Sequence, residues 1–182
     1  NPGSNYTNTR HNIGFKIIDA INAHFKLSKQ KPKFKGLLTT GNIDEKKIYA
    51  IKPLTFMNNS GTAIKELIDY FKIDAKDVFV FHDDMDIDFG KIKAKFGGSS
   101  AGHNGIDSID KFIGKDYSRV RIGIGHPKQK KKVNNHVLED FKEDEEEKIK
   151  EITENIVKLI PTLIEKKMDL FSSKVNQNLN GI

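Results

Sequence analysis

Apolar residues recur three and four positions apart in four stretches of the chain, the spacing that gathers them on one face of a helix. Helices are therefore predicted over residues 12–27, 61–71, 105–113 and 143–167. Asn59 or Ser60, just ahead of the second stretch, is its candidate cap. Pro161 should kink or divide the last one, because proline lacks the backbone N–H that a helix interior requires. Residues 176–182 are polar and are predicted to form a loosely held tail.

Four other stretches have strand patterns, at residues 46–51, 78–82, 91–96 and 118–125. The second is a continuous apolar run, which is typical of a strand covered on both faces. The last two alternate, so that basic residues share one face and apolar residues share the other. Strands and helices follow one another along the chain, which predicts an α/β fold: a mixed twisted β-sheet flanked by helices in a single domain spanning residues 1–182. In such sheets the functional site lies on loops beyond the strand ends.

The composition is that of a globular protein and removes several kinds of chemistry. The 182 residues include no cysteine, which excludes disulfides, thiolate metal sites and a cysteine nucleophile. No apolar run approaches the length needed to cross a bilayer, and the polar start does not resemble a signal peptide. We therefore expect a cytoplasmic protein with no membrane partner.

The charge is basic and unevenly distributed. The net charge is +6, with 31 lysines and arginines. Such a balance fits either a face that binds an anionic partner, usually nucleic acid, or a lysine-rich surface of biased composition. Acidic residues are concentrated in the segment 139–148, and this segregation favours a functional basic face.

One acidic segment has the spacing of a calcium loop but fails the full pattern. Aspartates occupy the first, third and fifth positions of residues 84–88. Phe89 stands where the loop needs glycine, and Lys95 stands where it needs a bidentate glutamate. We expect no metal here and interpret most of these acids as a solvated turn. Asp83 differs because it directly follows the apolar strand.

Three loops carry asparagines: Asn1, Asn58 and Asn104. An asparagine side chain offers both a donor and an acceptor without charge. A single one in a loop is usually part of a turn. Three of them, together with His11 and Asp83, suggest a neutral hydrogen-bonding cradle around one base, an arrangement suited to holding an amide or ester.

Four segments resemble bacterial-type peptidyl-tRNA hydrolase, in order and with compatible gaps over nearly the whole chain. They are NPGSNYTNTRHNIGF, KPLTFMNNSG, FHDDMDIDFGKIKAKFGGSSAGHNGIDSI and YSRVRIGIGHP. The resemblance implies an enzyme that cleaves the ester joining a peptide to the terminal ribose of tRNA. It implies no cofactor and no metal, a monomer, and peptidyl-tRNA as the partner, held by its acceptor stem and 3′ end.

The resemblance also implies something about the start of the chain. Members of this family open with a short apolar strand that ends in a glycine turn just before the NPG motif and lies inside the sheet. We therefore expect the chain as printed to lack the domain's first β-strand, with further residues ahead of Asn1 in the full protein.

The resemblance assigns catalytic roles to four residues. His11 is the general base that takes a proton from the attacking water, a task that suits a neutral imidazole. Asp83 holds the other ring nitrogen and favours the imidazolium as it forms. Asn1 and Asn58 fix substrate and water, and Asn58 also stabilises charge on the ester oxygen. Without the resemblance, His11 would be interpreted as a helix cap or a surface histidine.

Further residues are assigned to substrate and RNA binding in the same way. Asn104, Met57, His103 and Tyr6 bind the substrate: Asn104 holds water or the peptide backbone, and Met57 and His103 line the groove. The tRNA end is gripped by Lys95 and Arg121. The basic segment 126–136 tracks the acceptor stem through contacts that position RNA without reading its bases. Residues 134–141 are expected to cover the peptide groove.

Two alternatives belong to other functional classes. The first is a non-catalytic RNA-binding protein built on the same fold, which the presence of His11, Asp83 and the asparagines disfavours. The second is a metal-dependent phosphoesterase that uses the HDDMD segment, and its activity would be lost with a chelator.

Overall fold

The computed structural model describes residues 1–127 and 133–179, with the side chains of residues 133 and 134 excepted. Its helices are α1 (Ile13–His24), α2 (Ser60–Phe71), α3 (Asn104–Ile113), α4 (Val133–His136), α5 (Glu143–Lys158), α6 (Ile160–Ile164) and α7 (Met168–Asn178). Its strands are β1 (Lys31–Lys33), β2 (Gly36–Ile43), β3 (Lys46–Pro53), β4 (Phe79–Asp84), β5 (Ile92–Phe96) and β6 (Ser118–Gly123). Four short 3₁₀ turns complete it: η1 (Ser4–Tyr6), η2 (Arg10–Asn12), η3 (Met57–Asn59) and η4 (Ala75–Asp77).

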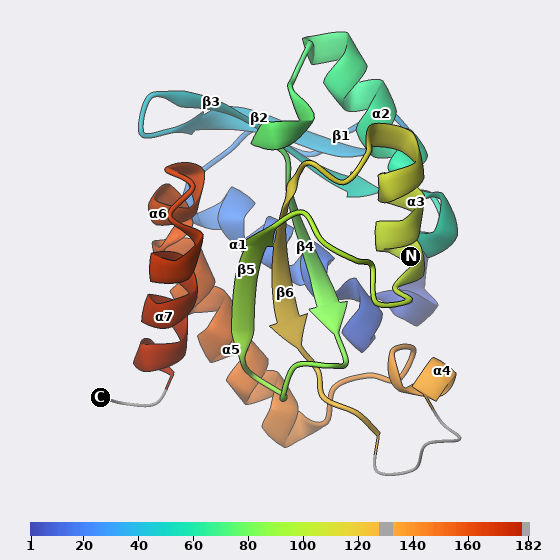
Figure 1. Cartoon of the computed structure of the whole chain (residues 1–182), viewed down its shortest axis with the longest axis vertical. Coiled ribbons are helices and arrows are strands. Elements are labelled where there is room, and N and C mark those ends of the chain that lie inside the picture. The colour runs from blue at the N-terminus through green and yellow to red at the C-terminus, as the bar shows by residue number, and fades with distance from the viewer. Residues whose placement is uncertain (128–132, 180–182) are drawn as a thin grey trace.

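The strands form two three-stranded sheets (Figure 1). One has the order β1-β2-β3 and is antiparallel throughout. The other has the order β4-β6-β5, with β4 parallel to β6 and β5 antiparallel to it. The α/β class and the mixed sheet are confirmed, but the prediction of one sheet is wrong. The strands β1 and β2 escaped prediction because their sequence lacks a clear alternation of polar and apolar positions.

The helices follow the sequence pattern with two corrections. Pro161 divides the segment 143–167 into α5 and α6, as predicted. Asn59 does occupy the cap position of α2, but its side chain makes no capping hydrogen bond. The predicted loose tail is wrong over its described part, because Asn176 lies in α7 and its amide bonds both the N–H and the carbonyl of Ile92, each at 2.9 Å. In β5, Phe96 belongs to the apolar face predicted for residues 91–96 but is 52% exposed.

Two apolar clusters hold the mixed sheet between helices. The larger joins one face of β5 and β6 to α1, α5 and α7, and its fully buried members include Ile17, Ile122 and Ile152. The smaller cluster lies on the other side of the molecule. It packs α2 and α3 together through residues such as Leu67 and Ile109. None of the described helices is long and apolar enough to cross a membrane. The carboxyl ends of β4 and β6 lie on the side of the molecule that carries α4 (Figure 1).

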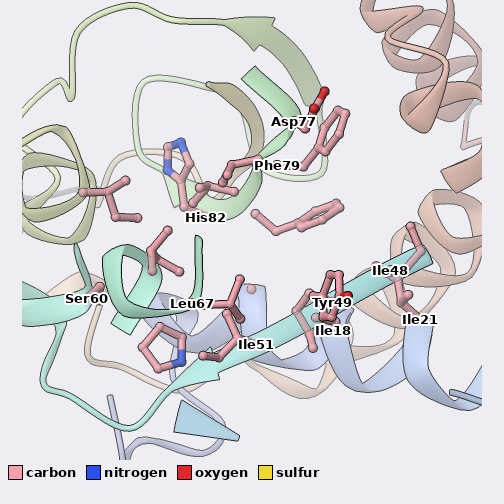
Figure 2. Close-up of a pocket in the computed structure, with 18 of the residues that line it drawn as sticks. Ile18, Ile21, Ile48, Tyr49, Ile51, Ser60, Leu67, Asp77, Phe79 and His82 are labelled. Carbon is pink, nitrogen blue, oxygen red and sulfur yellow. The ribbon is translucent and has the colours of Figure 1, made fainter. Parts of the chain in front are cut away.

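A cavity of about 950 Å³ lies between the two sheets (Figure 2). Ile48, Tyr49 and Ile51 of β3 line it on one side, and Phe79 and His82 of β4 line it on the other. Within the described residues, each of these strands pairs with a neighbour on one edge only. The strand expected ahead of the first residue stays a prediction, and the two free edges are where such a strand would find partners.

Candidate active site

A cleft of about 470 Å³ opens beyond the carboxyl end of β4. Its walls come from η1, η2, η3, the end of β4, the loop before α3, and the segment after α4. All eight residues predicted for catalysis and substrate binding line it: Asn1, Tyr6, His11, Met57, Asn58, Asp83, His103 and Asn104. The structure thus brings together residues that are spread over more than half of the chain. The larger inter-sheet cavity is mainly apolar, so the chemistry gathers in the smaller space.

His11 and Asp83 form a close pair in the floor of this cleft. The Nδ1 atom of His11 lies 2.7 Å from Oδ1 of Asp83, a carboxylate that is 2% exposed. Because the carboxylate only accepts, Nδ1 carries the proton and donates it. Burial alone would raise the pKa of Asp83, but the charge that His103 and His11 carry when protonated, together with their hydrogen bonds, outweighs burial and holds that pKa below its usual range. Asp83 is therefore an anion at neutral pH.

His103 contacts the same carboxylate oxygen, a role the sequence did not predict. Its Nε2 lies 2.9 Å from Oδ1 of Asp83. Its Nδ1 accepts hydrogen bonds from the backbone N–H groups of Gly105 and Ile106, at 3.1 and 3.3 Å, so that His103 caps α3. The prediction described His103 as lining the groove, and the structure adds that it is held at both ring nitrogens.

A third imidazole, that of His82, lies behind the other two. Its Nδ1 is 2.7 Å from the carbonyl oxygen of Asp83, and its ring centroid is 4.9 Å from that of His103. Burial, followed by repulsion from His103 when that ring is protonated, lowers the pKa of His82 to about 3, so the ring is neutral at neutral pH. His82 does not line the cleft. Of the three imidazoles, His11 alone combines a place in the cleft with a ring nitrogen that has no hydrogen-bond partner among the described residues.

The asparagines divide into one that is engaged and two that are free. Asn1 Oδ1 accepts a hydrogen bond from the backbone N–H of Met57 at 2.9 Å, which fixes η3 beside the cleft and leaves the Asn1 amide N–H₂ available. Asn58 and Asn104 are exposed, and their side chains make no hydrogen bond within the described part of the chain. Both can therefore direct donors and acceptors at a bound substrate.

A metal ion would have three potential ligands here, since one ligand atom each from His11, Asp83 and His103 lies within 4.8 Å of the others. Hydrogen bonds from the two imidazoles to the Asp83 carboxylate already link these groups. A histidine that binds a metal through Nε2 must carry its proton on Nδ1. In His103 that position faces two N–H donors, so the trio is built as a hydrogen-bonded network and is a poor metal site.

The interpretation of residues 84–88 as a solvated turn is wrong for Asp84. Its side chain is 6% exposed, and Oδ2 accepts from Nε of Arg121 at 2.7 Å. Its other oxygen accepts from the backbone N–H of Asp86. Asp86 does lie at the surface, where it pairs with His126. The sequence could not reveal the difference because Arg121 is 37 residues away.

The predicted RNA-gripping residues lie together on the basic face of β5 and β6. In the antiparallel register Lys93 faces Arg121, and Lys95 faces Arg119. Burial, then the charges of Arg121 and Arg119, lower the pKa of Lys95, which shows how closely positive charge is gathered. Arg119 itself is 1% exposed and binds Asp110 and the Ser99 carbonyl, so it anchors the loop before α3. Lys95 and Arg121 do not line the cleft.

Arg10 is a residue whose importance the sequence analysis missed. It is buried, pairs with Glu145 at 2.7 Å, and donates to the carbonyl oxygens of Glu139 and His136. The backbone N–H of His11 also bonds the Val137 carbonyl at 2.8 Å. These contacts tie the segment after α4 against η2. Within the segment expected to cover the groove, Val137 and Leu138 line the cleft. Residues 128–132 of the predicted basic segment lie outside the described residues.

Comparisons with known proteins agree with this geometry. The family model described as peptidyl-tRNA hydrolase matches residues 1–181. A peptidyl-tRNA hydrolase of Pelagibacter ubique is 71% identical over 176 residues, covering 97% of this chain and 95% of that protein. One from Ehrlichia canis is 44% identical, covering 98% of this chain and 92% of the relative. The crystal structure of peptidyl-tRNA hydrolase from Acinetobacter baumannii superposes with a TM-score of 0.89 at 32% identity, over 96% of this chain and 90% of that one. The chain therefore belongs to the peptidyl-tRNA hydrolase family.

Proposed function

We propose that this protein hydrolyses the ester bond of peptidyl-tRNA by a water molecule that His11 activates, releasing free tRNA and peptide. The observation that carries the proposal is the His11–Asp83 pair, at 2.7 Å, in a cleft lined by asparagines. The Nδ1 proton of His11 is donated to Asp83, so Nε2 of His11 is the unprotonated nitrogen and can accept a proton from water. Family membership supplies the substrate class.

The reaction follows from these protonation states. The oxygen of a water molecule attacks the ester carbonyl carbon while His11 Nε2 takes the water's proton. Asp83 stabilises the imidazolium that results, and the exposed amide of Asn58 donates to the oxyanion of the tetrahedral intermediate. Collapse of the intermediate breaks the bond to the ribose oxygen, which leaves with the proton from His11. No cofactor or metal is required, because the imidazole supplies the base and an ester is reactive enough for activated water.

Other cleft residues hold the substrate around this centre. The Asn1 amide orients the ester and water, and the first residue of α3, Asn104, binds water or the peptide backbone. Met57 and Tyr6 supply apolar walls, to which Phe56 and Leu138 add side chains that are 58% and 48% exposed. Such exposed apolar groups at a cleft rim suit the side chains of a peptide.

The RNA part of the substrate lies on the basic face. Lys95 and Arg121 bind phosphate of the tRNA 3′ end, while the acceptor stem follows the basic residues beyond β6. One chain supplies all eight predicted cleft residues, which supports a monomer. The substrate arises in translation, which supports action in the cytoplasm.

The alternatives make different use of the same residues. A non-catalytic RNA-binding protein would not need His11 to keep a free nitrogen in the cleft. A metal-dependent phosphoesterase would need Asp84 as a ligand, but that carboxylate is committed to Arg121.

The deciding experiment is single-turnover cleavage of an N-blocked aminoacyl-tRNA by wild type and His11→Ala, with tRNA affinity measured separately. The variant should lose about 10²–10⁴-fold in rate while it retains tRNA affinity, because the phosphate contacts lie on other residues. His24→Ala, at an exposed position near the end of α1, is the matched control. Near-normal single-turnover rates in His11→Ala would remove the catalytic assignment, and loss of activity with a chelator would favour the metal-dependent alternative.

A further inference from the structure

The imidazole of His103 is held by two groups that fix where its proton lies. Backbone N–H groups only donate, so the Nδ1 atom that receives those of Gly105 and Ile106 carries no proton. A carboxylate only accepts, so Nε2, 2.9 Å from Asp83 Oδ1, carries the proton. The two contacts together select one neutral tautomer of His103.

The helix start is shaped to receive this ring. A Cβ atom at Gly105 would lie 3.0 Å from Cε1 of His103 and 2.5 Å from Sδ of Met57. A side chain there would require the flexible end of Met57 to move and the imidazole of His103 to give by a few tenths of an ångström, so glycine lets the start of the helix pack against both residues without displacing them. The first turn of α3 is thus packed directly against the imidazole.

His103 and His11 donate to the same atom. Asp83 Oδ1 receives Nδ1–H of His11 at 2.7 Å and Nε2–H of His103 at 2.9 Å, and the two ring centroids are 4.8 Å apart. Two donors on one oxygen fix the direction of the carboxylate and share its charge. His103 therefore affects how strongly Asp83 attracts the proton and the ring of His11.

We propose that His103 is a positioning residue: the N-terminus of α3 holds its imidazole as the neutral Nε2–H tautomer, which in turn holds Asp83 in place for His11. The consequence for catalysis rests on the proposed function of His11. The hydrogen bonds run from the backbone of α3 to the imidazole of His103, then to Asp83, and then to the imidazole of His11. His103 Nδ1 is occupied by the helix backbone and is not available to the substrate.

A second proton on His103 would break this arrangement. Burial lowers the pKa of His103, but the charge of Asp83 and its hydrogen bond raise it above the usual value. The added proton would have to occupy Nδ1, where it would displace two backbone donors at the positive end of a helix. The cap therefore opposes the second proton that Asp83 attracts to this ring. The charged or titratable groups around it are His11, His82, Asp83, Asp84 and, beyond Asp84, Arg121.

Two substitutions separate the two contacts of His103. In His103→Asn the side-chain oxygen takes the place of Nδ1 and keeps the cap, since asparagine is a favoured capping residue, but nothing reaches Asp83. In His103→Gln the longer amide takes the place of Nε2 and keeps a donor for Asp83, while the cap is lost. His24→Asn and His24→Gln are the matched controls at an exposed histidine.

The experiment is a titration of the full chain with ¹⁵N-labelled histidine, followed by NMR, together with melting curves and single-turnover rates. Wild-type His103 should show the Nε2–H tautomer at neutral pH. His103→Asn should move the midpoint of the His11 titration to higher pH, because Asp83 loses a compensating donor. His103→Gln should leave that midpoint nearer to wild type and lower Tm by about 2–4 °C through the lost cap.

Each result decides between the inferences. A doubly protonated or Nδ1–H His103 at neutral pH overturns the proposal, as does an equal shift of the His11 midpoint in the two variants. If the midpoint shifts as expected but the acidic limb of the cleavage rate does not move with it, the positioning role stands and the role of His11 as base fails.

Discussion

Asp83 and Asp84 are neighbours on β4 and both line the cleft, yet their carboxylates have partners in two different regions of the molecule. Successive side chains of a strand point to opposite faces. Asp83 receives N–H groups from two imidazoles of the cleft, whereas Asp84 pairs with Arg121 of the basic face at 2.7 Å. The first partner set keeps a fixed anion beside a base, and the second holds a cation where RNA phosphate is expected. The end of one strand thus joins the chemical centre to the RNA face.

The comparison also shows what sets the role of a carboxylate. Both aspartates are buried, and both would be costly to bury without partners. Neutral N–H donors satisfy Asp83 without cancelling its charge, so it can stabilise an imidazolium. The guanidinium of Arg121 neutralises the charge of Asp84, so the role of that carboxylate is to hold Arg121 in place.

The largest expected effect comes from removing the charge on the cleft side. Asp83→Asn should lower the single-turnover rate by about 10²–10⁴-fold with little change in tRNA affinity, because an amide neither favours imidazolium nor selects the tautomer of His11. The acidic limb of kcat/KM should move to lower pH, since an attractive negative charge is gone. Asp88→Asn, in the exposed turn after the same strand, is the control. An unchanged acidic limb would remove Asp83 from the catalytic pair.

The next effect concerns the neutral imidazole behind the pair. His82 titrates at about 3 in the folded protein and near its ordinary value of 6.5 when unfolded, so the unfolded chain binds more protons between these pH values. The free energy of unfolding should therefore fall as pH drops through this window, by about 2 kcal/mol between pH 7 and pH 5. In His82→Asn the fall should be smaller. Equal pH dependence of urea denaturation in both proteins would contradict a buried neutral His82.

Smaller effects are expected on the RNA side. Lys95→Ala or Arg121→Ala should weaken tRNA binding chiefly at low salt and reduce the slope of log affinity against log salt by roughly one unit. The rate of cleavage at saturating tRNA should change little, because neither residue lines the cleft. Lys158→Ala, an exposed position on α5, removes the same charge far from this face and should leave the slope unchanged. An unaltered slope in the first two variants would place the RNA elsewhere.

The smallest effect distinguishes Asp84 from its neighbour most directly. Asp84→Asn should strengthen tRNA binding at low salt by about threefold, the size of a partly exposed charge interaction, because Arg121 is released for phosphate. The cleavage rate at saturation should stay within the range of wild type. Weaker binding would instead mean that Asp84 orients Arg121 for the RNA.

The sequence by itself determined several of the regular elements and named the eight predicted residues of the cleft. Helical spacing predicted α1, α2, α3 and the division at Pro161, because amphipathic periodicity is a local property of the chain. The motifs named all eight predicted cleft residues, although they could not show how those residues touch. The roles assigned to them remain predictions that the experiments above test.

Tertiary structure alone decided the remaining features, because each depends on partners far apart in the sequence. The split into two sheets, the Asp84–Arg121 pair and the Arg10–Glu145 pair join residues whose proximity no local pattern encodes. The tautomer of His103 depends on a carboxylate 20 residues away together with the first turn of its own helix. A hydrogen bond is defined by distance and direction, and spacing along the chain fixes neither until the helices and sheets have packed.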